Sequence, residues 1–384
     1  MVRNYPVIHR SARQMMLSVS LTAARRGRLW WAAVSLALFL APTAHAQSQQ
    51  QDADPNPPDA TSLAISAVPI FSAGMAYNTF IQGGTPNLHP LLSPVILIPF
   101  GQNWLVESRD TFEINLAPVP GESGYKGYLQ KEVDYLQLDY IANRYVTITV
   151  GRFLTPFGVF NERLYPVWIR DLQSDPLILP ISTGPSGAGS GVMLRGAFNA
   201  TPKMEINYAT YFSTLNTDPP WDSDRMFGWR AGMYLPGPRL EFGGSFQHLL
   251  QEDHSNAFGF HFAWQPPPLP LDIRAEYARS HSGSGYWIES AYKLSQVPVL
   301  QDQMRRVQLV ARLQQFYAGR FVNPNLPTVN TNMFEFGINY YFQDDLRFVT
   351  SYGRQFAPEG GNMNVWTVGV TYRLALPVGH GDVQ

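Results

Sequence analysis

The feature of this sequence that most restricts its fold is an alternation of apolar and polar side chains with a period of two residues. In 333–343, Phe334, Phe336 and Ile338 fall on one side and Glu335 falls on the other. Successive side chains of a β-strand point to opposite faces, so this period predicts strands with one apolar and one polar face. The alternation recurs along the chain in segments of about ten residues, and we find no convincing amphipathic helical stripes.

Sixteen segments fit this description, and the first two fit it least well. Most end near Gly, Pro, Asn or Asp, the residues that commonly interrupt strands. The predicted strands are 69–82, 91–101, 103–117, 128–142, 145–154, 190–200, 203–215, 227–236, 239–250, 256–265, 271–281, 284–294, 306–318, 331–343, 346–357 and 363–375. We therefore predict fourteen to sixteen strands, with sixteen favoured.

The N-terminal part of the chain has the pattern of an export signal. The first 46 residues contain six arginines and no acidic residue, and they include an apolar run from Leu29 to Leu40. The small residues Ala44 and Ala46 flank His45 in the pattern of a cleavage site. This predicts a cleaved signal peptide over 1–46, with a retained anchor as the alternative.

The remaining boundaries follow from the same pattern. Residues 47–60 are rich in Gln, Asp and Pro and predict a disordered lead-in. The strands then place a barrel at 61–375, followed by a short tail at 376–384. Translation starting at Met15 or Met16 is an alternative to Met1, because the basic region before the apolar run is long.

Strand length and composition favour a membrane barrel over a soluble sandwich. Aromatic residues make up 13% of the chain and charged residues only 15%. The segments are longer than the usual strand of about 5–6 residues, and several have aromatic residues near their ends. Backbone groups in hydrocarbon must all be paired, so the strands must close into an antiparallel transmembrane β-barrel. A soluble exported β-protein remains the alternative.

Closing the sheet would place the polar faces around a water-filled lumen. The candidate pore-lining residues carry charges of both signs and are Arg109, Arg195, Lys203, Glu205, Arg230, Arg274, Glu276, Arg306, Arg312 and Glu335. A mixture of signs predicts weak ion selectivity, because selectivity comes from rings of one sign. We expect Ile338→Arg to disturb insertion into lipid, whereas Asn339→Arg on the lumen side should be tolerated.

The connections differ in length, as outer-membrane barrels require. Short turns at 200–203, 265–270 and 343–346 are expected at one end of the barrel, and longer loops at 118–127, 216–226, 295–305 and 319–330 at the other. The longest connection is 155–189. It mixes Gly, Pro and Ser with Trp168, Arg170 and Asp171, and is too long to be a simple link.

The beginning of that connection has a distinctive motif. The stretch GRFLTPFGVFNERLYPVWIRDLQSDPLIL, at 151–179, directly follows the strand YVTITV, and its characteristic residues are Gly151, Arg152, Thr155, Pro156, Phe157, Gly158 and Glu162. In these residues the stretch resembles the phosphate-selective porin O/P-like group of outer-membrane porins. The resemblance implies a sixteen-stranded porin, usually a homotrimer, whose long loop folds into the lumen. The sequence shows no arginine ladder dense enough for phosphate selectivity.

Together these observations predict a porin of the bacterial outer membrane, through which small polar solutes or ions diffuse passively. The candidate constriction residues in the long loop are Asn161, Glu162, Arg163, Arg170 and Asp171. The alternative is a barrel without transport function, either an adhesin or a lipid hydrolase. We expect no enzyme activity and no metal or cofactor. We also expect no nucleic-acid partner, since the formal charge of the chain is only -1 and phosphate binding needs a surplus of basic residues.

Overall fold

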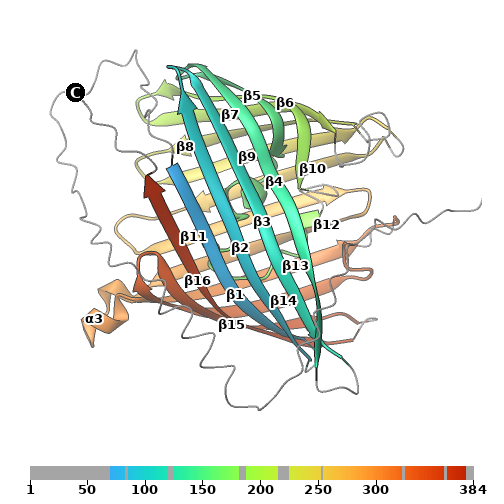
Figure 1. Ribbon diagram of the computed structural model, residues 1–384, viewed down its shortest axis with the longest axis vertical. Coiled ribbons are helices and arrows are strands. Elements are labelled where there is room, and N and C mark those ends of the chain that lie inside the picture. Colours follow the sequence, from blue (N-terminus) through green and yellow to red (C-terminus); the bar gives the residue numbers. More distant parts are fainter. Residues whose placement is uncertain are drawn as a thin grey trace, which may run out of the picture.

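The computed structural model describes residues 70–82, 85–119, 124–180, 187–214, 225–251, 254–321, 325–358 and 361–377. These residues form one barrel, which Figure 1 shows from the side with β1–β4 in front. None of the helices in the described residues is long and apolar enough to cross a membrane.

Sixteen strands make up the barrel. Their bounds are β1 Ile70–Gln82, β2 Thr85–Phe100, β3 Trp104–Pro118, β4 Tyr125–Asn143, β5 Val146–Leu154, β6 Ala188–Thr201, β7 Met204–Thr214, β8 Arg225–Leu235, β9 Leu240–Leu249, β10 Asn256–Trp264, β11 Leu271–Ser280, β12 Gly283–Lys293, β13 Val307–Ala318, β14 Thr331–Gln343, β15 Leu346–Phe356 and β16 Met363–Pro377. All sixteen predicted strands are confirmed, and most ends agree within three residues.

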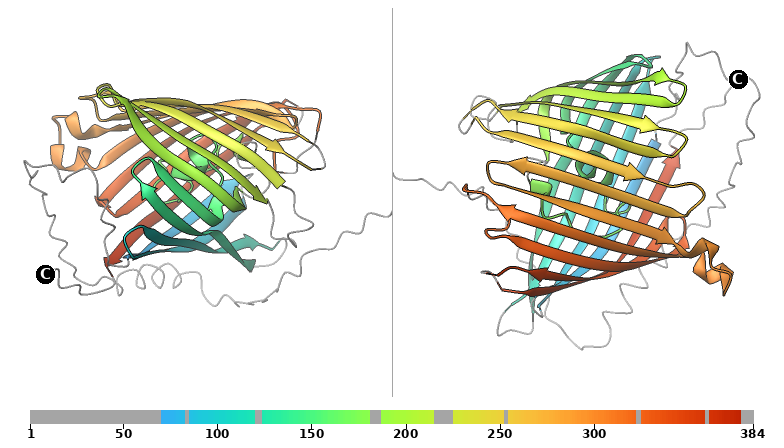
Figure 2. Two further views of the ribbon diagram at one scale, coloured as in Figure 1. Left: turned by 90° about the horizontal axis from the view of Figure 1, so that it is seen from above. Right: turned by 180° about the vertical axis from the view of Figure 1, so that it is seen from behind.

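The barrel is closed because the first strand pairs with the last. Each strand pairs antiparallel with its neighbours in sequence, and β1 also pairs with β16 from Ile70↔Pro377 to Gln82↔Val365. The two views in Figure 2 show the strands running obliquely around the interior. A closed sheet has no edge strand, so every strand can satisfy its backbone groups within the barrel.

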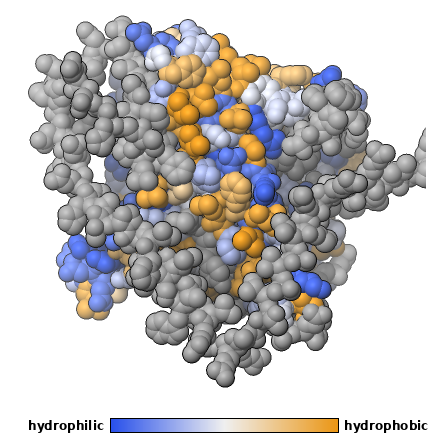
Figure 3. Space-filling view, in the orientation of Figure 1, coloured by the Kyte–Doolittle hydropathy of each residue, from blue (hydrophilic) through white to orange (hydrophobic). Residues whose placement is uncertain are grey.

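The outer face of the barrel is apolar along its strands. In β14, Phe334, Phe336 and Ile338 are each more than 40% exposed, whereas Glu335 and Asn339, on the other face of the strand, are buried. Figure 3 shows apolar side chains gathered on the face formed by the front strands. The inside–outside assignment of the alternation is therefore confirmed for this strand.

The interior differs from the prediction of a uniformly polar lining. Phe153, Met226, Trp287 and Phe316 lie on inward positions of their strands and are fully buried. They are buried because neighbouring inward side chains and the connection after β5 cover them. The alternation identifies which face a residue occupies, but not whether that face meets water.

Two further predictions are corrected by the topology. The 294–306 connection, with η2 (Leu294–Gln296) and α3 (Gln301–Met304), lies at the same end as the turns 202–203 and 344–345 and not with the other long loops, because strand direction alternates. The last strand runs to Pro377, two residues into the predicted tail. The predicted signal peptide and lead-in lie outside the described residues.

Candidate functional site

The connection after β5 folds into the lumen of the barrel. Its described parts are 155–180 and Gly187, and we call 155–180 the lumen segment. In Figure 2 this green segment lies inside the ring of strands in both views. It contains the short helix η1 (Phe160–Leu164), and its contacts with the inner wall define the candidate site.

The two ends of the connection are tied together by Asn161. This side chain is fully buried, and its amide donates hydrogen bonds to the backbone oxygens of Thr155, at 3.0 Å, and of Gly187, at 2.7 Å. The Thr155 backbone N–H also donates to the Gly187 oxygen. Asn161 therefore closes the base of the segment and does not face open lumen.

The start of the segment is fixed to the opposite wall by Glu276 of β11. Its carboxylate accepts hydrogen bonds from the backbone N–H groups of Val159, at 3.1 Å, and Phe160, at 3.3 Å. The preceding residue, Gly158, has a φ of 63°, which is in the left-handed region that favours glycine. A glycine here therefore brings two backbone donors onto a buried carboxylate.

Apolar side chains of the segment pack against the wall formed by β10–β13. The Phe160 ring lies edge-on to Trp287, with centroids 6.0 Å apart and planes at 80°. The other buried members of this cluster are Phe157, Val159, Leu164, Ile178, Leu179, Ala257, Ala278, Phe316 and Leu326. Burying a large apolar side chain stabilises by about 1.5–3 kcal/mol, so this cluster holds the segment firmly.

Farther along, Ser174 inserts into an ion pair on the wall. Arg312 of β13 donates to Glu335 of β14 at 2.8 Å, and both residues are 1% exposed. The Ser174 hydroxyl donates to the same carboxylate at 2.6 and 2.8 Å and accepts from Arg312. The pair therefore holds the segment and is closed off from solvent.

Asp171 forms a second attachment nearby. Its carboxylate accepts hydrogen bonds from Arg274, at 3.1 Å, and from Gln308, at 3.0 Å. Burial raises the pKa of Asp171, and Arg274 and Arg347 oppose that rise. Arg274 also pairs with Asp272.

The segment reaches the side of the barrel where β1 and β16 meet. Arg347 of β15 donates to the backbone oxygens of Val167, at 3.1 Å, and Arg170. The Trp168 ring lies over Gly74 of β1, where a Cβ would come within 1.8 Å of it. Contacts on both sides show that the segment crosses the lumen.

Arg170 stabilises the segment itself. Its guanidinium donates to the backbone oxygens of Leu164 and Tyr165 and to the Asp175 carboxylate. The side chain is 8% exposed, and its guanidinium lies over the Phe160 ring at 5.0 Å. Arg170 is therefore an internal clamp and does not present its charge to the lumen.

Glu162 and Arg163 are partly exposed charges of the segment, as is Asp175, which pairs with Arg170 and whose side chain is 55% exposed. The Glu162 carboxylate lies 3.8 Å from both Arg195 of β6 and Arg230 of β8. The side chains of Glu162 and Arg195 are 25% and 34% exposed. These contacts are longer than hydrogen bonds, so both groups remain partly hydrated.

Arg163 makes a two-pronged pair with Glu241 of β9, at 2.6 and 2.9 Å, and its side chain is 43% exposed. Burial lowers the pKa of Arg163, but the Glu241 carboxylate more than offsets this, and the net pKa is raised. Arg230 donates to the same carboxylate at 3.0 Å. Glu241 therefore links two arginines, one from the segment and one from the wall.

Arg109 of β3 lies on a different part of the wall. It donates to Asp134 of β4 at 2.8 Å, and its guanidinium lies between the rings of Tyr135 and Tyr165, at 5.1 and 5.0 Å. Arg109 is 3% exposed. It therefore joins the wall to the segment through Tyr165.

Two predicted pore-lining residues are placed elsewhere. Lys203 lies in the exposed turn between β6 and β7, and Arg306 lies in the exposed turn that precedes β13. Both residues lie one position outside a strand. The alternation that assigned them to the lumen-facing side therefore does not apply to them. Glu205, the second residue of β7, lies on the inward side at partial exposure.

Sequence reasoning missed several residues that complete these attachments. Asp134, Tyr165, Ser174 and Gln308 all contact predicted residues, and each has an ordinary polar side chain with no local motif. Buried His261 lies 3.5 Å from Glu241. Only the strand register could have linked these residues to their partners.

The architecture defines the class of protein. A closed sixteen-strand antiparallel barrel with an apolar outer face is an outer-membrane β-barrel, since strands can cross a bilayer only when the sheet is closed. No protein-family model and no curated protein matches the sequence.

Solved structures match the fold at low sequence identity. Salmonella typhi OmpF is 9% identical, with a TM-score of 0.57 and coverage of 80% of this chain and 98% of that one. Pseudomonas putida OprB is 8% identical, with a TM-score of 0.54 and coverage of 80% and 93%. A variant of the Rh. blastica porin is 10% identical, with a TM-score of 0.52 and coverage of 79% and 100%.

These neighbours are bacterial outer-membrane porins, and the chain shares their fold. Together with its closed barrel and apolar outer face, this places the protein in the bacterial outer membrane. The comparisons do not single out the phosphate-selective type.

Proposed function

We propose that this protein is a porin, a passive channel through which small hydrophilic solutes cross the outer membrane. The observation that carries the proposal is a sixteen-strand barrel whose lumen is crossed by one docked segment. A barrel of this size leaves room for an aqueous channel, and a segment across it reduces the free cross-section.

The constriction lies where Glu162 and Arg163 of the segment face Arg195 of the wall. These three side chains combine charge with the partial exposure that contact with a passing solute requires. Asn161, Arg170 and Asp171, which are buried, hold the segment in place. We therefore divide the predicted constriction residues into two that meet solutes and three that support them.

The channel should have little preference for anions. In the described part of the chain, Arg109, Arg230 and Arg312 each pair with a carboxylate, of Asp134, Glu241 and Glu335 respectively, and Arg347 is engaged by the backbone oxygens of the segment. A paired guanidinium has little capacity left to bind phosphate. We therefore propose a channel for general small solutes or ions and not a phosphate-selective one.

Planar-bilayer recording of the purified protein tests both statements. The proposal expects ohmic conductance steps and a reversal potential close to zero in a salt gradient. A bilayer that stays silent would favour the barrel without transport function, an adhesin or a lipid hydrolase. A reversal potential near the anion limit would contradict the weak selectivity.

Three earlier expectations belong to the same proposal. The protein acts without enzyme activity or cofactor, it assembles as a homotrimer, and its residues 1–46 are removed on export. The homotrimer is implied only by the resemblance of 151–179, and cross-linking of the protein in native membranes tests it. N-terminal sequencing of the mature chain tests cleavage after Ala46.

A further inference from the structure

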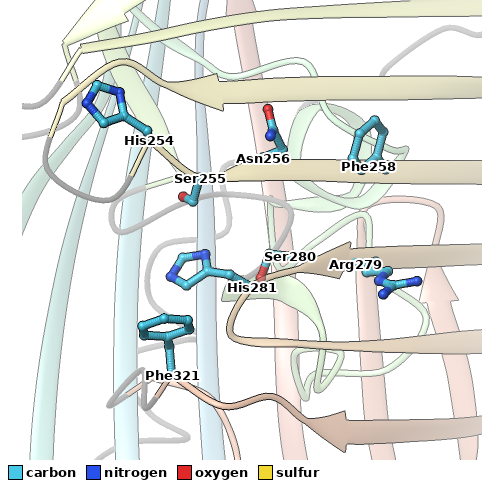
Figure 4. A pocket seen from close by; sticks show the side chains of 8 residues that line it. All are labelled: His254, Ser255, Asn256, Phe258, Arg279, Ser280, His281 and Phe321. Atoms are coloured by element: carbon cyan, nitrogen blue, oxygen red, sulfur yellow. The ribbon is translucent and has the colours of Figure 1, made fainter.

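A pocket of about 410 Å³ lies at the rim of the barrel, outside the lumen. Figure 4 shows its eight side chains at the ends of three neighbouring hairpins, β9–β10, β11–β12 and β13–β14. They are His254, Ser255, Asn256, Phe258, Arg279, Ser280, His281 and Phe321. From this pocket we propose a binding site for a phosphate-bearing lipid headgroup of the outer leaflet.

The pocket opens toward lipid because its strand residues face outward. A row of outward side chains runs across four neighbouring strands, through the register pairs Trp229↔Phe246, Phe246↔Phe258 and Phe258↔Arg279. Neighbouring rings in the row touch, with centroids 6.4 Å apart for Trp229–Phe246 and 5.1 Å apart for Phe246–Phe258. Exposed aromatic rings near the ends of barrel strands are typical of the girdles at the membrane–water interface.

Arg279 is the charged member of this row. It is exposed, and within the described residues its guanidinium forms no ion pair. A cation at the level of the girdle can reach the headgroups while its stem stays against apolar surface. Arginine is also the side chain best suited to grip phosphate, because its planar fork donates two parallel hydrogen bonds.

Neutral donors surround the guanidinium. The Asn256 oxygen is bonded to His248 at 2.9 Å, so its amide nitrogen is left to donate. The Ser280 hydroxyl accepts from the Ser282 N–H at 3.2 Å and can donate its own hydrogen. None of the eight lining residues, all of them described, carries a carboxylate, so the lining favours an anion over a cation.

Apolar surface next to the pocket favours a lipid over a free ion. Phe258 and Phe321 flank it at 50% and 59% exposure, and Phe260 continues the track toward the centre of the strand at 64%. The His281 ring packs edge-on against Phe321, with centroids 5.1 Å apart. A free phosphate would leave these rings unused, whereas an acyl chain would cover them.

The position along the barrel agrees with this occupant. The turn that carries His281 is itself only two residues long, but this end of the barrel also carries the long connections 155–187, 215–224 and 319–330. The opposite end carries the turns 202–203 and 344–345. Short turns face the periplasm in bacterial outer-membrane barrels, and longer loops face outward. The headgroup is therefore one of the outer leaflet.

Lipid retention by the purified full chain tests the proposal. The probes are a diphosphorylated acyl glycolipid and the same glycolipid without phosphates, and native mass spectrometry counts the molecules that remain after detergent exchange. Arg279→Gln should reduce retention of the phosphorylated lipid about tenfold, the loss expected for one charge-assisted hydrogen bond. The matched control is Arg354→Gln, another outward arginine, which bonds Asn364 and lies outside the pocket.

Three results would overturn the proposal. They are equal retention by Arg279→Gln and the unchanged protein, equal retention of the two lipids, or binding of inorganic phosphate with no retained lipid. The comparison of the two lipids uses the unchanged protein, so it decides the question even if Arg279→Gln fails to fold. Conductance should be unaffected by Arg279→Gln, which separates this test from that of the channel.

Discussion

Gly158→Ala is the smallest change that should release the lumen segment from the wall. Gly158 has a φ of 63°, and a Cβ there would lie 2.2–2.3 Å from the carboxyl atoms of Glu276. Those atoms accept the backbone hydrogen bonds of Val159 and Phe160. The added methyl group must therefore displace either the segment or the carboxylate that holds it.

The size of the effect follows from two contributions. A non-glycine residue in the left-handed region costs about 1–2 kcal/mol. Each hydrogen bond to a charged group contributes about 1.5–3 kcal/mol, and at least one of the two to Glu276 should be lost. The docked state of the segment is therefore weakened by about 3–5 kcal/mol relative to the released state. This changes the equilibrium constant between the docked and released segment by a factor of about a hundred or more.

Single-channel conductance in a planar bilayer measures the consequence. Gly158→Ala should give larger and noisier steps, because the segment no longer keeps one position across the lumen. Gly244→Ala is the matched control: the nearest atom to its added Cβ is 3.7 Å away, so it should behave like the unchanged protein. Heat-dependent migration of folded barrels in electrophoresis would verify that both variants are closed. Unchanged conductance of a folded Gly158→Ala barrel would refute the role of the segment as a constriction.

The other predictions test the wall and the charges. Ile338→Arg places a charge on the lipid face of β14 and should reduce the free energy of unfolding in bilayers by about 2–4 kcal/mol. Gln130→Arg, on the exposed inward side of β4, should change that free energy little. Arg312→Ala leaves the Glu335 carboxylate buried without its guanidinium partner and should lower the free energy of unfolding by about 3–5 kcal/mol. A loss below about 1 kcal/mol would show that water reaches the ion pair. Glu162→Gln should shift the reversal potential toward anions, and the same shift in Glu335→Gln would mean that buried charges also set selectivity.

The sequence predicted the wall of the barrel well, because a strand's period of two is a local property. In β14 the apolar Phe334, Phe336 and Ile338 face outward, as their spacing indicates. Errors occurred where that period ends, at Lys203 and Arg306, since a turn residue has no face of the sheet to occupy.

Contacts between distant residues could not be predicted in this way. Ser174 meets Glu335 across 161 positions of sequence, and Val159 meets Glu276 across 117. Neither pair has a spacing that identifies it. The resemblance of 151–179 to a porin loop indicated that the segment enters the lumen, but not which wall residues receive it.

Asn339 shows what this limitation means for reasoning about a pore. Its inward position predicts contact with water, and hence tolerance of Asn339→Arg. The side chain is instead 1% exposed and donates to the Asp171 backbone oxygen at 2.9 Å and to Gln308 at 3.0 Å. An arginine there would collide with the docked segment, so we now expect Asn339→Arg to destabilise the barrel or release the segment. Which inward residues meet solutes is thus decided by where the segment docks, and Glu162, Arg163 and Arg195 are among the charged residues that it leaves in contact with water.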